Sequence, residues 1–266
     1  MAGVEIVKDI EMRMNRTRSL NRLADISDWE QEGVHSKIME ELREGVYIHR
    51  KAWEYAHCIH GLTTLGAVAE DARAIAVGAG HERPLYYFAN QIQEMVATDI
   101  YEDPEHEGNP EMLVSPEAFA PFPYRHSHLV VRRMSGTDLM YDDSTFDFAF
   151  TLSSIEHFGS RDNQKRAMEE MRRVVKPGGV ICVATELILN RGTHPEYFTL
   201  QELQAVILSN PGLTMVGGDL DLRISRSLFE NPIELDVEHN FRVSPHIVLK
   251  SGNVIWTSVM MFFRKD

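Results

Sequence analysis

Residues 74–80, AIAVGAG, decide the fold, because a short apolar run leads directly into Gly78-Ala79-Gly80. Such a run is typical of a buried strand that ends in a tight turn. Glycine takes positive φ without steric cost and has no side chain, so the backbone of this turn can approach a ligand closely. The stretch therefore predicts a strand, a turn and a ligand-binding edge, in that order.

Strand and helix patterns alternate on the C-terminal side of this turn. The helical spacing of apolar residues predicts helices over 84–92 and 163–175. Apolar runs closed by polar or turn residues predict further strands over 95–98, 129–134, 146–152 and 180–185. Alternation of this kind implies parallel strands joined by right-handed crossovers. The fold class predicted is therefore α/β, with a doubly wound, mostly parallel sheet.

The flanks of this region have different patterns. Residues 1–70 show helical spacing, and their apolar face either packs on the core or covers the ligand site. Residues 102–124 are rich in Pro, Glu and Gly, which predicts a long irregular connection. Near the C-terminus, apolar runs flank Ser251-Gly252-Asn253 and predict an antiparallel hairpin. We therefore divide the chain into a helical segment, residues 1–70, and one α/β domain, residues 71–266.

The composition of the 266-residue chain is that of a globular protein, with 43% hydrophobic residues and a formal net charge of -13. A protein that tracks nucleic-acid phosphates needs a basic face, so this balance favours a small-molecule partner over nucleic acid. Cys58 and Cys182 are too few for a disulfide framework and favour a reducing compartment. No window approaches the roughly 18 apolar residues of a membrane span. We therefore expect a cytoplasmic protein with no membrane partner.

Asp99 ends the strand that follows the glycine turn, nineteen residues after Gly80. An acidic side chain at this place can accept hydrogen bonds from both ribose hydroxyls of a nucleoside. The alternative is that Gly78 and Gly80 only make a turn and that Asp99 caps a neighbouring element. The glycine loop alone does not decide between the two, because a third glycine is missing.

Four blocks follow one another in order: AVGAGHE at 76–82, VATDIY at 96–101, STFDFAFTLSSIEHFG at 144–159 and MRRVVKPGGVICVATE at 171–186. Together they resemble the class I S-adenosylmethionine-dependent methyltransferases, in particular those of type 11. The resemblance covers roughly residues 70–190, and its FDF and KPGG elements separate it from nicotinamide-binding relatives. It implies a seven-stranded Rossmann-like sheet, S-adenosylmethionine as cofactor, and methyl transfer as activity.

The resemblance also implies which residues hold the cofactor. The glycine loop would pass beneath its methionine and ribose parts, and Asp99 would hold the ribose hydroxyls. Ala76 stands where the family usually has an acid, and Glu82 stands where it often has a third glycine. Glu82 would either face the cofactor's ammonium group or cap the following helix. The full set implied is Gly78, Ala79, Gly80, Glu82, Asp99, Ile100, Met134, Ser135, Gly136, Thr151 and Leu152.

His157 follows the strand at 146–152, at the edge of the sheet where the methyl group would emerge. We expect it to act as a general base, oriented by Glu156, because a neutral hydroxyl is a weak nucleophile. The alternative is that Glu156 and His157 only cap the next helix or order the loop. Close histidine pairs occur elsewhere without a fuller ligand motif, so no metal site is predicted.

The acceptor is expected to be a hydroxylated small molecule or a sugar, methylated on oxygen. His194-Pro195-Glu196-Tyr197 and Glu186 follow the strand at 180–185 and are candidates for the acceptor wall. Residues 1–70 and an insertion at about 186–245 would cover it. Two other interpretations stay open: a scaffold protein that keeps the fold without methyl transfer, and an NAD-dependent oxidoreductase. A homodimer is an open option for the oligomeric state.

Overall fold

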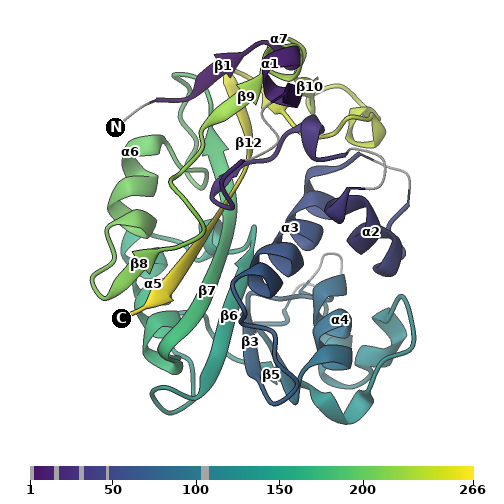
Figure 1. Cartoon of the computed structure of the whole chain (residues 1–266), viewed down its shortest axis with the longest axis vertical. Coiled ribbons are helices and arrows are strands. Elements are labelled where there is room, and N and C mark those ends of the chain that lie inside the picture. The colour runs from purple at the N-terminus through teal and green to yellow at the C-terminus, as the bar shows by residue number, and fades with distance from the viewer. Residues whose placement is uncertain (1–2, 15–17, 30–32, 46–47, 103–107) are drawn as a thin grey trace.

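The computed structural model describes residues 3–14, 18–29, 33–45, 48–102 and 108–266. Its centre is a ten-stranded sheet in the order β10-β11-β12-β7-β6-β3-β4-β5, with β2 and β8 pairing on β12 beside this path. Helices cover both faces of the sheet (Figure 1). The doubly wound α/β architecture expected from the alternating pattern is confirmed.

Five parallel strands form the half of the sheet that starts at the glycine turn. The chain enters at β3 and adds β4 and β5 on one side, then returns to add β6 and β7 on the other. This reversal makes a switch point beside β3, where ligands bind outside the carboxyl ends of the strands. The strands are β3 (Arg73–Val77), β4 (Glu94–Asp99), β5 (Leu129–Arg133), β6 (Phe146–Leu152) and β7 (Val175–Ile188).

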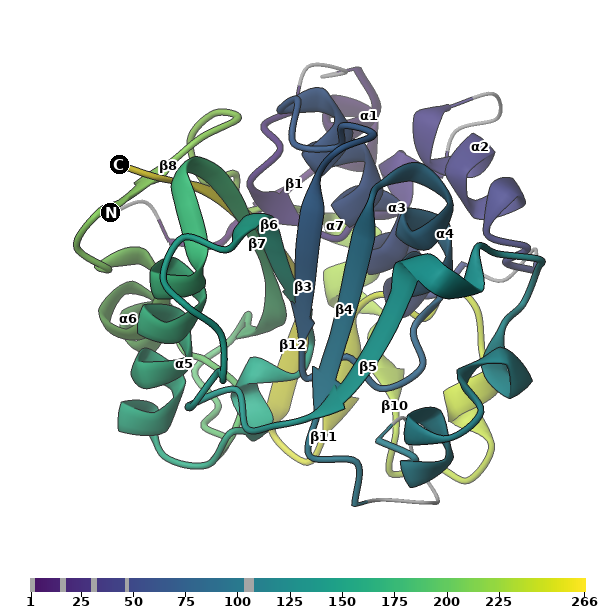
Figure 2. The same cartoon turned by 90° about the horizontal axis from the view of Figure 1, so that it is seen from below.

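The crossover helices lie on opposite faces of this half. α4 (Arg83–Gln91) leads from β3 to β4, and α5 (Arg161–Val174) leads from β6 to β7. Figure 2 shows α4 beside α3 (Arg50–Thr64) on one face, and α5 beside α6 (Leu200–Leu203) on the other. Ser160 caps α5, because its hydroxyl oxygen accepts a hydrogen bond from the amide of Asn163 at 3.2 Å.

The antiparallel half of the sheet is larger than expected. β12 (Val254–Lys265) pairs with β7 and forms the predicted hairpin with β11 (Leu249–Ser251) around Gly252. The seven strands implied by the resemblance become ten, because three short strands also join here. They have two or three residues each, and the two-residue strands are too short to show a period in the sequence. These strands are β2 (Arg22–Leu23), β8 (Leu213–Met215) and β10 (Ile233–Glu234).

The N-terminal segment is joined to the last third of the chain by backbone pairing. β1 (Glu5–Val7) pairs in parallel with β9 (Arg223–Ser225), which precedes α7 (Arg226–Glu230). The segment was expected to be helical, and it contains short strands as well as helices. Its helices are α1 (Asp9–Met14), α2 (Val34–Glu41) and α3.

Asn21 fastens this segment to the sheet at a single buried point. Its amide nitrogen donates to the carbonyls of Val216 and Gly218, at 2.8 and 2.6 Å, and its amide oxygen accepts from the backbone of Phe262 at 2.6 Å. Each polar atom of the side chain is therefore paired with backbone.

Two smaller features complete the fold. The connection predicted at 102–124 contains short 3-10 turns at Pro110–Leu113 and Pro116–Phe119, and its residues 103–107 lie outside the described part of the chain. Among the described residues, no helix has both the length and the apolar character needed to cross a bilayer.

Candidate active site

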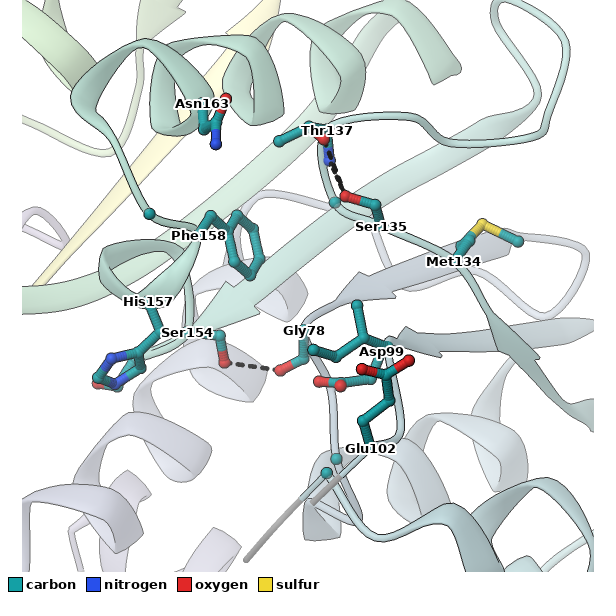
Figure 3. A pocket seen from close by; sticks show the side chains of 16 residues that line it. Gly78, Asp99, Glu102, Met134, Ser135, Thr137, Ser154, His157, Phe158 and Asn163 are labelled. Atoms are coloured by element: carbon teal, nitrogen blue, oxygen red, sulfur yellow. Dashed lines mark hydrogen bonds between the residues drawn. The ribbon is translucent and has the colours of Figure 1, made fainter.

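A cavity of about 780 Å³ lies at the carboxyl ends of β3, β4, β5 and β6. This volume is in the range of small-molecule and cofactor sites. Figure 3 shows His157 and Asp99 on either side of Gly78, with Phe158 between these walls. The lining includes seven residues of the implied cofactor set, namely Gly78, Gly80, Asp99, Ile100, Met134, Ser135 and Gly136.

The glycine turn forms one wall with backbone alone. Gly78 has a φ of 70°, in the left-handed region that favours glycine. A Cβ atom built on Gly78 would lie 2.6 Å from the Cβ of Ser154, so no side chain fits there. The Ser154 hydroxyl donates to the carbonyl of Gly78 at 2.6 Å, which fixes the turn against the end of β6 (Figure 3). The turn is therefore a place that only glycine can occupy.

The opposite wall carries the acidic side chain at the end of β4. One carboxylate oxygen of Asp99, Oδ1, accepts a hydrogen bond from the amide of Tyr101 at 3.0 Å. The backbone carbonyl of Asp99 accepts from the amide of Met134 at 3.0 Å, which joins this wall to the loop after β5. In that loop, the Ser135 hydroxyl accepts from the amide of Thr137 at 3.2 Å. These bonds hold Asp99 at the cavity, and its second carboxylate oxygen accepts no hydrogen bond from the described residues.

Four residues of the implied cofactor set lie behind the cavity wall rather than on it. Ala79, Thr151 and Leu152 are buried, and the carbonyl of Leu152 accepts a hydrogen bond from the ammonium group of Lys51 at 2.7 Å. Glu82 stands at the N-cap of α4, but its side chain makes no capping hydrogen bond. Its carboxylate lies 3.2 Å from Lys51 instead, so it neither caps the helix nor lines the cavity.

His157 and Glu156 lie in a 3-10 turn, Ile155–His157, directly after β6. Consecutive side chains of such a turn point about 120° apart, since it has three residues per turn. His157 is accordingly half-exposed on the cavity wall, whereas Glu156 is fully buried against β7. The closest carboxylate to the Nδ1 atom of His157 is that of Glu196, at 3.2 Å. Nδ1 of His157 therefore pairs with Glu196, from the segment after β7, and not with Glu156, its neighbour in sequence.

A group of ionic side chains, here named the charge cluster, lies directly behind this end of the cavity. Its glutamates are buried, and the side chains of Arg50 and Lys51 are 18% and 19% exposed. Arg50 contacts Glu54 at 3.0 Å and Glu186 at 2.6 Å, and Lys51 contacts Glu54 at 3.5 Å. The cluster touches the cavity through Ser153, whose hydroxyl donates to Glu54 at 2.8 Å. Its members are Arg50, Lys51, Glu54, Glu82 and Glu186.

Sequence reasoning missed the cluster's members on α3. Arg50 and Glu54 are spaced i,i+4 on one helix, and such pairs are common on exposed faces. The available signal was their position within a helix that is otherwise apolar, where unpaired charges are costly. It could have indicated burial, but it could not have named Glu186 as the partner.

Glu156 and Glu186 are neighbouring carboxyl groups with different pKa shifts. Burial raises the pKa of Glu156 well above its usual range, and the charge of Glu186 raises it further. Burial acts in the same direction on Glu186, but Arg50 and a hydrogen bond with Glu156 hold its pKa below the usual range. Of the two carboxyl groups, Glu156 is therefore the one that holds a proton more readily.

Comparison with known proteins identifies the nucleotide-binding half. Residues 75–183 match the family model described as a methyltransferase domain. A 65-residue stretch is 35% identical to the Aspergillus luteorubrus protein ltbC, whose name assigns it as a methyltransferase. The match covers 24% of this chain and 22% of that protein, so the chain spans about a fifth of its curated relative.

Solved structures share the fold at low sequence identity. A protein from Galdieria sulphuraria, assigned as a sarcosine dimethylglycine methyltransferase, is 13% identical, with a TM-score of 0.53 over 87% of this chain and 98% of that one. The [4+2]-cyclase SpnF is 12% identical, with a TM-score of 0.52 over 100% of this chain and 99% of that one. Both likenesses concern the fold alone. Residues 75–183 thus form a methyltransferase domain, and S-adenosylmethionine is the cofactor that such domains use.

Proposed function

We propose that the protein transfers a methyl group from S-adenosylmethionine to a hydroxyl oxygen of a small molecule or sugar. The observation that carries this proposal is the His157–Glu196 pair at the wall of the cavity, 3.2 Å between Nδ1 and Oε1. A histidine held in this way can remove a proton from an acceptor that lies beside the cofactor.

The cavity has features that fit the cofactor. Asp99 offers carboxylate oxygens to ribose hydroxyls, and Ile100 and Met134 offer apolar surface to adenine. Gly78 leaves the backbone bare where the ligand has to pass closely. Lys51, held at the end of β6 by the carbonyl of Leu152, is a cation within reach of the same edge. These contacts support the implied cofactor positions.

In this reaction the protein forms no covalent bond to the substrate; its main task is to position the acceptor. When bound, the cofactor supplies a methyl group on a sulfonium, and the protein has to align a nucleophile with it. His157 would accept the hydroxyl proton at Nε2 while its Nδ1–H donates to Glu196. The carboxylate fixes this tautomer and stabilises the imidazolium that forms.

The same proposal includes a cover over the acceptor. Residues 1–70 and the stretch at about 186–245 would form this cover, because each supplies a charged side chain close to the end of β6. Arg50 comes from the first, and Glu196 from the second. Two buried cysteines without a disulfide, Cys58 and Cys182, support a cytoplasmic site of action.

The test combines binding with turnover. Calorimetry should detect S-adenosylmethionine and its demethylated product, and a screen of sugars and hydroxylated metabolites should find a methylated acceptor. His157→Ala should then lower kcat by about 100- to 10,000-fold and leave cofactor affinity unchanged. Binding of NAD instead of S-adenosylmethionine would overturn the proposal. Cofactor binding without turnover on any acceptor would favour a scaffold protein with this fold.

A further inference from the structure

A second cavity, of about 250 Å³, lies within the N-terminal segment, and no described residue lines both cavities. It is bounded by α1, the 3-10 turn Ile26–Asp28, the start of α2 and the later part of α3, and Figure 1 shows α2 beside α3. His60, in its lining, lies ten residues after Arg50 on α3, about 15 Å along the helix axis. The volume is below that of most drug-sized ligand sites, so the cavity suits a small ligand.

Positive side chains dominate the lining of this second cavity. Three arginines line it, Arg13, Arg18 and Arg22, whereas Asp28 supplies the one carboxylate among the described lining residues. The guanidinium of Arg22 contacts Asp28 at 2.9 Å, so this negative charge is already paired. The cavity thus keeps an excess of positive charge in a chain whose formal net charge is -13.

Two polar groups of the lining have no hydrogen-bond partner among the described residues. One is Nη1 of Arg18, whose side chain is only 4% exposed, and the other is the hydroxyl of Ser27. The rest of the Arg18 guanidinium is held from behind, because Nε donates to Asp221 at 3.0 Å and Nη2 donates to the carbonyl of Arg223 at 3.3 Å. Asp221 also contacts the guanidinium of Arg223 at 2.7 Å, so its charge is shared between two arginines. Buried donors without a partner are costly, and both groups can donate to an oxyanion.

The N-terminus of α2 adds backbone donors at the same cavity. Gly33 and Val34 line the cavity, and Gly33 is the N-cap, so no N-cap side chain accepts from the first amides of the helix. The first turn of α2 also contains no acidic residue. The partial positive charge of a helix N-terminus favours an anion.

The pKa shifts of the surrounding side chains reflect this positive charge. Burial lowers the pKa of Arg22, and the charge of Arg18 lowers it further, although Asp28 acts in the opposite direction. Burial also lowers the pKa of His60, and the charge of Arg22 adds to this effect. An anion in the cavity would offset the repulsion between the two guanidinium groups.

We propose that this cavity binds a phosphate group, either as inorganic phosphate or as the phosphate of a small metabolite. A tetrahedral oxyanion has enough oxygens to accept from a guanidinium, a hydroxyl and backbone amides at once. The donors are Nη1 of Arg18, the hydroxyl of Ser27 and the first amides of α2, with Arg13 at the exposed rim. The site does not depend on methyl transfer.

A phosphate in this cavity would connect separate parts of the N-terminal segment. Arg18 precedes β2, Ser27 lies in the turn after it, and Gly33 begins α2. A ligand that binds only the folded protein stabilises it in proportion to its occupancy. Phosphate should therefore stabilise the segment that we propose as a cover over the acceptor.

The experiment uses the full chain without cofactor, in about 0.1 M sodium chloride so that distant surface charges are screened. Calorimetry should show one site per chain for inorganic phosphate, and Tm should rise with phosphate concentration. Ser27→Ala removes a hydroxyl that makes no hydrogen bond with the described residues, so the fold should be preserved. The loss of one hydrogen bond to a charged ligand should weaken phosphate binding by about 10-fold or more.

A matched pair of variants separates the cavity from general charge attraction. Arg13→Gln removes a positive charge at the exposed rim and should weaken phosphate binding by about 2- to 5-fold. Lys8→Gln removes the same charge from an exposed position just before α1, outside the lining, and should leave the affinity unchanged.

Each outcome supports or overturns the site. Absence of phosphate binding, binding that Ser27→Ala does not weaken, or equal losses in Arg13→Gln and Lys8→Gln would overturn it. A parallel titration with glucose 6-phosphate distinguishes the two sources of phosphate. Tighter binding than inorganic phosphate assigns the site to a phosphorylated metabolite, and weaker binding assigns it to the free ion.

Calorimetry with S-adenosylmethionine on the same sample keeps the two proposals apart. Cofactor binding without phosphate binding removes only the phosphate site. Phosphate binding without cofactor binding removes only the proposed function.

Discussion

The cavity and the charge cluster meet at Ser153 but are built in opposite ways. The cavity is bounded largely by backbone and small side chains from the loops after consecutive strands, between Gly78 and Asn163. The charge cluster is filled with ion pairs and joins segments far apart in the chain, since Arg50 contacts Glu186 and Glu54 also accepts from Ser258. The cavity has room for a ligand, whereas the side chains of the charge cluster are already paired with one another.

This difference separates two physical tasks. A cofactor wall needs room and a few directed groups, which local loops can provide. A buried ionic group has to offset the loss of hydration with good geometry, and removing one partner leaves a charge without compensation. We therefore expect substitutions in the charge cluster to act on stability, and substitutions at the cavity to act on binding and turnover.

The strongest test of this separation is Glu54→Ala, which leaves Arg50 and Lys51 without a shared buried partner. We expect a loss of about 3–5 kcal/mol in the free energy of unfolding, measured by urea denaturation. The matched control is Glu230→Ala, because Arg226 and Glu230 form an exposed pair with the same i,i+4 spacing. That change should cost less than about 1 kcal/mol. Equal effects would show that the cluster is not sealed from water.

The next largest effect is expected from low pH, which lowers stability through three histidines that lie outside the cavity. Burial lowers the pKa of His35 to about 4, that of His246 to about 4 and that of His49 to about 3, and none of the three lines the cavity. In the unfolded chain these histidines take up protons near pH 6.5, whereas in the folded protein they stay neutral until the pH is close to 4. Their contribution to the free energy of unfolding is therefore complete above pH 6.5 and is lost as the pH falls towards 4.

For His35, which is deeply buried, this amounts to about 2–3 kcal/mol between pH 7 and pH 4. The free energy of unfolding, measured in urea at several pH values, should therefore decline over that interval. His35→Gln should flatten the decline, since glutamine does not titrate. An unchanged slope in this variant would assign the acid sensitivity to other groups.

At the cavity, Asp99→Ala should weaken S-adenosylmethionine binding by about 10- to 100-fold, because charge-assisted hydrogen bonds to the ribose would be lost. Asp99→Asn keeps one oxygen for the amide of Tyr101 and should show a smaller loss. Calorimetry measures both, and urea denaturation should show little change in stability. Full affinity in Asp99→Ala would place the ribose elsewhere.

The smallest effect is expected at the border between the regions. Glu196→Gln preserves a hydrogen-bond acceptor for His157 but removes the charge, so kcat should fall by no more than about 10-fold, with KM unchanged. Steady-state kinetics of the variant and of the unmodified protein measure both constants. A kcat identical to that of the unmodified protein would show that Glu196 does not position the base.

The two regions also differ in what the sequence could reveal. The sequence predicted the exact bounds of the strand at 146–152, and it placed the glycine turn and Asp99 at one edge of the sheet. Both predictions depend on local patterns, because an apolar run or a turn is determined by residues that are neighbours in the sequence. The partner of His157 was expected at Glu156, its neighbour in sequence, and lies at Glu196. Contacts such as Arg50 to Glu186 depend on how distant segments dock, which no spacing rule contains.

The position of β12 has a consequence for the order of folding. Asn21, near one end of the chain, is bonded to Phe262 on β12, and β12 also supplies the antiparallel neighbour of β7. Contacts across such sequence separations form slowly, because a long loop has to close before they contribute. The five parallel strands that carry the cavity leave the ribosome before β12. We therefore expect a nascent chain to fold its five parallel strands first, and to dock its N-terminal segment on the sheet only after β12 has formed.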